Sequence, residues 1–210
     1  MKIALVDYGA GNLTSVRKAF THLGAELVQP ATPSDLAGAA AVVVPGVGHF
    51  SATRSLTPEW HAAIRDGLDS GRPLLGICVG MQWLFEGSTE APDCPGLGVL
   101  AGHCVQLTGG QARLKVPHVG WNTLEPTKPS VLLAGLDHHG SVYFTHSYAG
   151  PVTGATAAAT EYGGERFAAA VEDGIVMGVQ FHPEKSSETG LAIIRNFLQR
   201  VAALAGAGVR

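Results

Sequence analysis

The sequence predicts a single α/β domain in which helices flank a central, mostly parallel sheet. Short apolar strands alternate with helical segments over the first hundred residues, as in a parallel sheet with crossover helices. Residues 40–46 form a continuous apolar run, which is typical of a strand buried on both faces. After residue 96 the segments become short and strand-like, which predicts added antiparallel strands in the C-terminal half. A chain of 210 residues suffices for one buried core, so we expect residues 1–210 to form one domain.

The first half predicts two helices among four strands. Apolar residues recur at helical spacing from Leu13 to Leu23, and Gly24 ends that helix. Thr57 and Pro58 supply the cap and first turn of the second helix. In chain order, we expect a strand at 2–7, a helix at 12–24, strands at 25–30 and 40–46, a helix at 58–71 and a strand at 73–77.

The second half predicts one helix after a series of strands. Gly and Pro separate the strand-like pieces, which we expect to extend or flank the parallel core as antiparallel strands. These pieces are residues 99–107, 115–124, 140–148, 155–162, 167–174 and 175–183. The chain then predicts a helix at 186–206, with Leu191, Ile194, Leu198 and Val201 on one face.

Composition and patterning exclude several classes of protein. A net charge of −3 gives no broad basic surface for nucleic acid or anionic lipid. The apolar runs are too short to span a membrane, and the N-terminus predicts a strand and not a signal peptide. Cys78, Cys94 and Cys104 are too few for a disulfide framework, and no zinc-like spacing occurs. We therefore expect a cytoplasmic protein without a metal.

Two glycine-containing loops follow strands but do not predict a cofactor. Residues 7–14 and 45–51 begin like a dinucleotide-binding fingerprint. However, Thr14 and Ser51 occupy the third glycine position, and the sequence has no Walker A lysine motif. Both loops are interpreted as tight strand-to-helix turns, and no cofactor is expected.

Residues 76–80, Gly-Ile-Cys-Val-Gly, have the form of a nucleophile elbow, with sulfur in place of oxygen. A buried strand precedes them and a helix follows, so Cys78 should project at the carboxyl edge of the sheet, where open α/β sheets bind ligands. The start of the helix favours the thiolate. A buried structural cysteine is the alternative, and it stands for Cys94 and Cys104.

His182 and Glu184 are the expected partners of this thiol. Pro183 holds His182 in an extended conformation. If that geometry continues, the side chain of Glu184 points to the same side and reaches the ring nitrogen that faces away from the thiol. An ordinary His-Pro-Glu turn is the alternative. In the context of the elbow, we favour a triad of Cys78, His182 and Glu184.

A nucleophilic thiol also needs donors for a developing oxyanion. The amide of Val79, directly after the nucleophile, is one expected donor. The turn at residues 45–48 is the expected source of the second, with Val47 and Gly48 as candidates, because its glycines permit unusual backbone angles. The same freedom lets this turn present either face of a peptide to Cys78.

The segments PGVGHF, GICVGMQ and FHPEKSS resemble, in order, the motifs of the class I (triad) glutamine amidotransferases, and the resemblance covers essentially the whole chain. It implies a flavodoxin-like fold, attack of Cys78 on the amide of glutamine, and a thioester that water resolves. By the same resemblance, several residues hold the glutamine. These are Gly46, Gln82, Glu90, His146 and Ser147. A simple helix-face position is the alternative for Gln82.

Finer features resemble one subfamily, the glutaminase subunits of imidazole glycerol phosphate synthase. They are DYGAGN, GMQ, KVPHVGWN, YFTHSY and PEKSS. The resemblance implies a separate cyclase subunit, a (β/α)₈ barrel, that receives ammonia from this chain. It also places five residues at the ammonia exit or partner interface, namely Asn12, Trp121, Asn122, Tyr143 and Lys185. Sheet packing is the alternative for Tyr143.

Three other interpretations stay open at this point. One is a glutaminase subunit of another synthase, such as that of anthranilate or pyridoxal phosphate synthesis. Another is a cysteine-elbow hydrolase with the same kind of sheet. The third is a non-catalytic binding subunit that keeps the fold.

Overall fold

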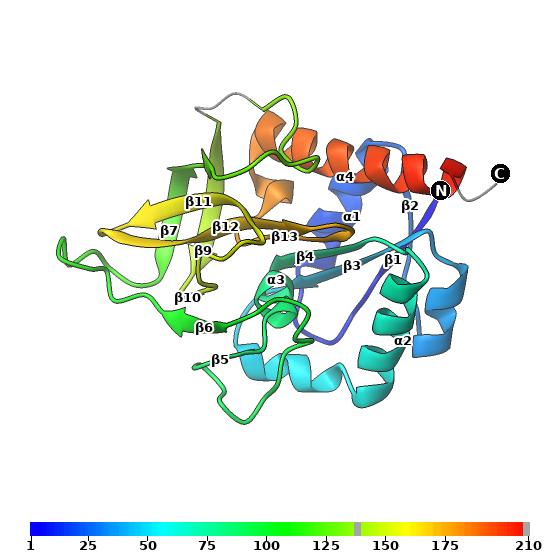
Figure 1. Cartoon of the computed structure of the whole chain (residues 1–210), viewed down its shortest axis with the longest axis horizontal. Coiled ribbons are helices and arrows are strands. Elements are labelled where there is room, and N and C mark those ends of the chain that lie inside the picture. The colour runs from blue at the N-terminus through cyan, green and yellow to red at the C-terminus, as the bar shows by residue number, and fades with distance from the viewer. Residues whose placement is uncertain (137–139, 208–210) are drawn as a thin grey trace.

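A computed structural model describes residues 1–136 and 140–207 and has the predicted α/β architecture (Figure 1). Its main sheet has eight strands in the order β2-β1-β3-β4-β13-β12-β11-β8. The first five are mutually parallel, in the order of flavodoxin-like folds, and the last three join antiparallel. The strands are β1 Lys2–Leu5, β2 Glu26–Val28, β3 Ala41–Gly46, β4 Leu74–Cys78, β8 Glu125–Pro126, β11 Thr156–Tyr162, β12 Glu165–Asp173 and β13 Val176–Val179.

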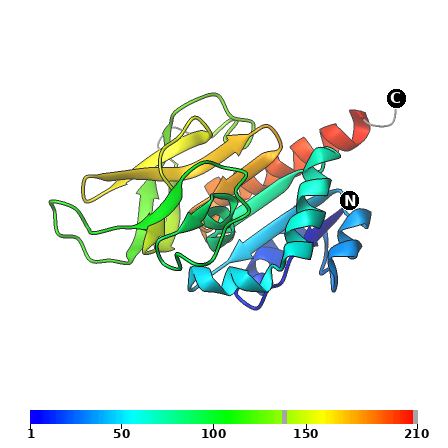
Figure 2. The same cartoon turned by 60° about the horizontal axis from the view of Figure 1, so that its bottom comes forward.

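Helices cover both faces of this sheet (Figures 1 and 2). On one face α1 packs against α4, where the rings of Phe20 and Phe197 meet edge to face at 6.4 Å between centroids. The other face carries α2 and the short segments before it. The helical elements are α1 Leu13–His22, α2 Pro58–Asp69, α3 Val79–Leu84, α4 Ser187–Ala207 and the 3₁₀ turns η1 Pro33–Gly38, η2 Phe50–Ser55 and η3 Pro183–Lys185. Within the described ranges, no helix is long and apolar enough to cross a bilayer.

Two small sheets lie at the end of the molecule away from the chain termini (Figure 1). The antiparallel pair β7 and β9 forms one, and β10-β6-β5 forms the other. Their strands are β5 Gly87–Ser88, β6 His103–Gln106, β7 His118–Thr123, β9 Ser141–His146 and β10 Tyr148–Ala149. The strands β5 and β8 and the 3₁₀ turns were not predicted, because elements this short carry little periodic pattern.

One predicted strand pairs differently from expectation. We expected residues 175–183 to add an antiparallel strand, but β13 lies in the centre of the sheet and runs parallel to β4. Only its other edge, toward β12, is antiparallel. Met177, Gly178 and Val179 are consecutive and all buried, as expected for a central strand that is covered on both faces.

The turn between β4 and α3 depends on close backbone packing. A Cβ placed on Gly80 would lie 1.8 Å from the carbonyl oxygen of Val44 on β3, and one on Gly76 would lie 2.6 Å from the carbonyl oxygen of Gly80. No side chain fits at either position, so both glycines are required for α3 to begin directly over the sheet.

Gly80→Ala should therefore destabilise the fold. We expect the free energy of unfolding to fall by about 3 kcal/mol, because the overlap is with rigid backbone. Gly38→Ala is the matched control, since nothing lies within 4 Å of a Cβ there. Urea denaturation of both variants tests this, and equal midpoints would contradict the packing argument.

Candidate active site

Cys78 ends β4 in a strained backbone conformation. Its φ of 54° and ψ of −111° lie outside the regions that non-glycine residues usually adopt. Such strain persists where the surrounding structure enforces it, typically at functional sites. The helix α3 begins at the next residue. The predicted elbow is therefore present, and the thiol lies at the carboxyl edge of the sheet.

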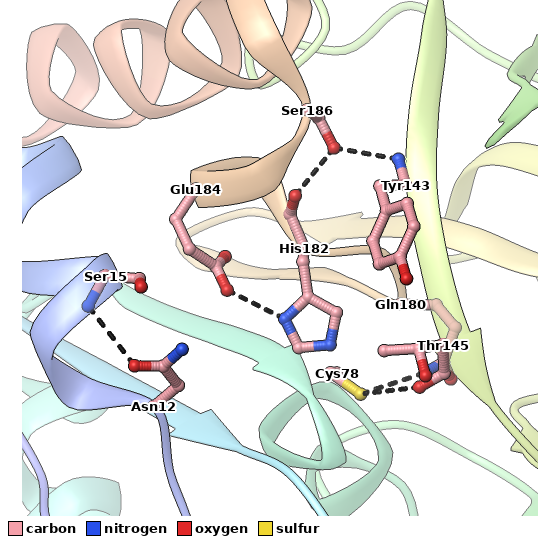
Figure 3. A network of polar contacts seen from close by, with 9 residues as sticks. All are labelled: Asn12, Ser15, Cys78, Tyr143, Thr145, Gln180, His182, Glu184 and Ser186. Carbon is pink, nitrogen blue, oxygen red and sulfur yellow. Dashed lines mark hydrogen bonds and ion pairs between the residues drawn. The ribbon is translucent and has the colours of Figure 1, made fainter. Parts of the chain in front are cut away.

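His182 lies beside this thiol because β13 is the neighbour of β4 in the sheet. Its Nδ1 is 2.9 Å from Oε1 of Glu184, and these side chains are only 2% and 1% exposed. Figure 3 shows the imidazole between the Glu184 carboxylate and Cys78. Nε2 has no hydrogen-bond partner within the described residues. The structure thus brings together the three residues predicted as a triad.

The pKa of His182 reflects this position. Burial alone would lower it, but the interactions with Cys78 and with Glu184 outweigh burial and raise the pKa to about 9. The backbone differs from expectation, since residues 183–185 form the 3₁₀ turn η3 instead of an extended segment. Glu184 still reaches Nδ1, because the turn folds the chain back toward the ring.

The backbone of His182 is held by β9. Its N–H donates to the carbonyl of Tyr143 at 2.9 Å. The hydroxyl of Ser186 donates to the His182 carbonyl at 2.6 Å and accepts from the Tyr143 amide at 2.9 Å. Sequence reasoning gave no role to Ser186, although it lies in the PEKSS segment that carried the resemblance.

A cavity of about 240 Å³ opens at Cys78. Seven further predicted residues line it, namely Val47, Gly48, Val79, Gln82, Glu90, His146 and Ser147. The structure adds three that were not predicted, Pro117, Thr145 and Tyr148. In the part of the chain that the structure describes, no three His, Cys, Asp or Glu side chains are grouped as metal ligands.

The loop after β3 presents its candidate donors unequally. The amide of Val47 donates to the carbonyl of Ala10 at 2.9 Å, so it is directed into the β1–α1 turn. Gly48 adopts a φ of +90°, which favours glycine. Gly46 lies beneath the loop, where a Cβ would be 2.0 Å from the hydroxyl of Tyr8. Its lack of a side chain lets Tyr8 pack there.

Glu90 and Gln82 bring acceptor oxygens to the lining of the cavity. Oε2 of Glu90 accepts from the amide of Phe50 at 2.7 Å. The Nε2 of Gln82 donates to the carbonyl of Tyr148 at 2.7 Å and to Oε1 of Gln180 at 3.1 Å, which uses both of its hydrogens. Gln82 therefore has only its oxygen left for a ligand.

His146 is held in its neutral form. Burial lowers its pKa to about 3, although its hydrogen bond to the carbonyl of Tyr148 opposes this shift. Its ring packs at a tilt against Phe144 and edge to face against Phe167. His146 is therefore a polar residue of the cavity lining that carries no charge at neutral pH.

Of the five predicted interface residues, three lie together and the two asparagines lie elsewhere. The Trp121 ring is 54% exposed and meets Tyr143 edge to face at 6.1 Å, and Nζ of Lys185 lies 6.0 Å from the Tyr143 ring. Asn122 instead donates to the carbonyl of Glu161 at 2.9 Å, on the opposite face of β7. Asn12 caps α1 by accepting from the Ser15 amide at 3.4 Å. Figure 3 shows Asn12 on the other side of Glu184 from Tyr143.

Glu184→Gln should lower the pKa of His182 by about 1–2 units, because the carboxylate stabilises the imidazolium. The raised pKa also predicts that this residue stabilises the fold fully below pH 6.5 and loses that contribution as pH rises through about 9. NMR titration of labelled histidine measures the pKa, and urea denaturation across this pH range measures the stability, with Glu86→Gln, an exposed carboxylate near His103, as control. An unchanged His182 titration in Glu184→Gln would contradict this account.

Comparisons with known proteins agree with this geometry. Residues 4–201 match the family described as glutamine amidotransferase class-I. The chain is 46% identical over 202 residues to the imidazole glycerol phosphate synthase subunit HisH of Xylella fastidiosa strain Temecula1, covering 96% of this chain and 99% of that protein. The HisH subunit of Deinococcus radiodurans is 42% identical over 205 residues, with coverage of 96% and 94%.

Solved structures share the fold at low sequence identity. A chain of PurLQS from Thermotoga maritima has a TM-score of 0.72 at 19% identity and covers 95% of this chain and 98% of that one. The glutaminase domain of CTPS from Trypanosoma brucei, with bound acivicin, has a TM-score of 0.66 at 17% identity, with coverage of 99% and 94%. With the full-length family match, these findings place the chain in the class I glutamine amidotransferases.

Proposed function

We propose that this protein is the glutaminase subunit of an imidazole glycerol phosphate synthase, which supplies ammonia for histidine biosynthesis. The observation that carries the proposal is the buried His182 imidazole, which is bonded to the Glu184 carboxylate and lies beside the Cys78 thiol at the edge of a polar cavity. The HisH relatives, at 42–46% identity over nearly the whole chain, support the choice of synthase.

In the first half of the reaction, the Cys78 thiolate attacks the side-chain carbonyl carbon of glutamine. The tetrahedral oxyanion that forms is stabilised by backbone amides, with Val79 as the donor nearest the nucleophile. When the C–N bond breaks, the His182 imidazolium gives its proton to the departing nitrogen. Ammonia leaves, and a γ-glutamyl thioester remains on Cys78.

In the second half, water hydrolyses the thioester. The now neutral His182 takes a proton from the water as it attacks the same carbon, and the C–S bond breaks to release glutamate and the thiolate. The carboxylate of Glu184 stays ionised throughout and holds the ring by Nδ1. The thiolate–imidazolium pair is thus restored for the next glutamine.

The cavity suits glutamine because its lining offers oxygen acceptors to a ligand with two nitrogen donors. Gln82 has only Oε1 to offer, and Glu90 keeps one carboxylate oxygen besides the one bonded to Phe50. An ammonium group and a carboxamide NH₂ are the groups that such oxygens bind. Neutral His146 and the hydroxyl of Ser147 complete the polar wall without adding charge.

Cys78→Ala should abolish release of glutamate and ammonia from glutamine, a loss of at least ~10³-fold, because no other group forms the thioester. A glutamine-mimicking electrophile should label Cys78. Cys94→Ala is the matched control and should retain both activities, because Cys94 is buried beside Thr53 away from the cavity. Labelling of Cys94 or Cys104 in place of Cys78, seen by mass spectrometry, would contradict the assignment.

The proposed docking surface for the cyclase subunit, a (β/α)₈ barrel, is the exposed face of β7 and β9. Val119 and Trp121 are 56% and 54% exposed there, and Tyr143 with Lys185 continues the surface. Large exposed apolar side chains grouped in this way are typical of protein interfaces. The same strand β9 holds His182 through the Tyr143 carbonyl, which connects this surface to the triad.

Docking of the partner is proposed to complete the oxyanion hole. The Val47 amide is bonded to Ala10, so the loop must turn a peptide before that amide faces Cys78. One missing donor typically lowers the rate by ~10²–10³-fold. A partner that binds the turned state better would raise glutaminase turnover by population shift.

The two asparagines have supporting positions. Asn12 caps the helix that follows the Ala10 turn, and Asn122 supports β7 from its inner face.

The isolated subunit should therefore turn over glutamine slowly, with a rise of ~10²-fold or more in the complex with the cyclase subunit and its ligand. Gly48→Pro should abolish this rise, because proline has a fixed φ and no N–H, so the loop can neither change between two peptide orientations nor offer the amide of residue 48 as a donor. Trp121→Ala should weaken the complex, whereas Val152→Ala, an exposed apolar residue outside β7 and β9, should not. Equal turnover in the free and bound states would contradict the switch.

A further inference from the structure

Gln180 is a fully buried polar residue directly after β13, and the mechanism above gives it no role. Its Nε2 lies 3.7 Å from Sγ of Cys78, within hydrogen-bonding distance for sulfur. Figure 3 shows Gln180 beside the sulfur, next to the carbonyl of Thr145. The orientation of its amide decides whether a donor or an acceptor faces the nucleophile.

The neighbouring hydrogen bonds fix that orientation. The carbonyl of Tyr148 can only accept, so the nitrogen of the Gln82 amide, 2.7 Å away, must donate to it. The other hydrogen of the same nitrogen then points to Gln180, 3.1 Å away, which must present its oxygen. The NH₂ of Gln180 is therefore directed at Sγ. If the Gln180 amide were turned over, its NH₂ would face the NH₂ of Gln82, which is also a donor. Its oxygen would then face the thiolate, which is also an acceptor.

The same carbonyl also fixes the two histidines behind it. Nδ1 of His146 donates to Tyr148 O at 2.9 Å, so Nε2 of His146 accepts from Nδ1 of His118 at 3.1 Å. Burial lowers the pKa of His118 to about 4 and leaves it neutral. A single backbone oxygen thus orders a chain of hydrogen bonds that ends at the nucleophile.

We propose that Gln180 is a further residue of the reaction, whose side-chain NH₂ donates a hydrogen bond to Sγ of Cys78 and favours the thiolate. The proposal rests on the proposed function of Cys78 as the nucleophile. A donor aimed at an anion stabilises the charged form, and its effect is large in a buried site. The other nearby group, the carbonyl of Thr145 at 4.0 Å, can only accept from the neutral thiol. Gln180 therefore favours the thiolate, whereas the Thr145 carbonyl favours the neutral thiol.

Other titratable groups also face the thiol, and a test of Gln180 must leave them unchanged. These are His182 with Glu184 behind it, the buried hydroxyl of Tyr8, and Glu90 and His146 across the cavity. The variants below leave all of them in place, so a change in thiol titration reports on the amide at position 180.

The test is the rate of alkylation of Cys78 by iodoacetamide as a function of pH, followed by peptide mass spectrometry. Gln180→Met keeps the length of the side chain and removes the donor. We expect the acid limb of its profile to move up by about one pH unit, which is about a tenfold slower reaction below the limb. Gln180→Glu should move the limb further, because a carboxylate would face the thiolate.

Thr160→Val is the matched control. Thr160 lies on β11 of the main sheet, away from the site, and the substitution removes its hydrogen bond to the carbonyl of Thr123 on β7. Its profile should equal that of the natural chain. In glutamine turnover, Gln180→Met should lower kcat about tenfold and change KM less, because Tyr148 still orients Gln82. Thermal denaturation of the three variants shows whether each is folded at the assay temperature.

The outcomes separate this inference from the proposed function. A shifted limb in both Gln180 variants and not in Thr160→Val supports the donor role. Profiles of Gln180→Met and Gln180→Glu that coincide with that of the natural chain would overturn it. If Cys78 reacts selectively and shows these shifts while no variant or natural chain hydrolyses glutamine, the donor role stands and the proposed function fails.

Discussion

The close contact between the backbone at Gly80 and the carbonyl of Val44 is the constraint on which the site depends. Because α3 begins directly over β3, the chain must reverse within one residue, and Cys78 takes up the strained conformation that this requires. The sulfur is thereby directed away from the core into the space between the loop after β3 and strand β9. A longer or looser turn would leave the thiol in the sheet, without a ligand cavity.

The two halves of the chain contribute different kinds of group to this space. The N-terminal half supplies the proposed nucleophile, Cys78, and the backbone amides proposed as oxyanion donors, at Val79 and in the loop at 46–48. The C-terminal half supplies fixed acceptors, since the carbonyls of Tyr143, Thr145 and Tyr148 each meet a group of the site. Fixed carbonyls orient His182 and the side-chain amide of Gln82, whereas the proposed oxyanion donors are backbone amides at Val79 and in the glycine-containing turn at 46–48.

Much of this arrangement could be predicted from the sequence, because it depends on local patterns. The elbow glycines and the apolar strand at 40–46 each specify a local geometry, and the structure has both. His182 and Glu184 meet as predicted, but through the 3₁₀ turn η3 and not through the extended segment that was expected. The central, parallel placement of β13 was missed, because strand order is set by contacts between segments far apart in the chain. Ser186 and Gln180 were missed for a related reason. Their partners, Tyr143 and Cys78, are distant in sequence and no periodicity marks them.

The central position of β13 also has a consequence for how the chain is made. Gln180 and Cys78 are 102 residues apart, yet they lie on adjoining strands. During synthesis the elbow therefore leaves the ribosome long before its base and its neighbouring strand, and β4 has an unpaired inner edge until then. Contacts of such long range slow folding and expose strand edges to other chains. In the nascent protein, Cys78 therefore meets His182 and Gln180 only when nearly all of the chain has emerged, so the proposed nucleophile is completed together with the cavity around it.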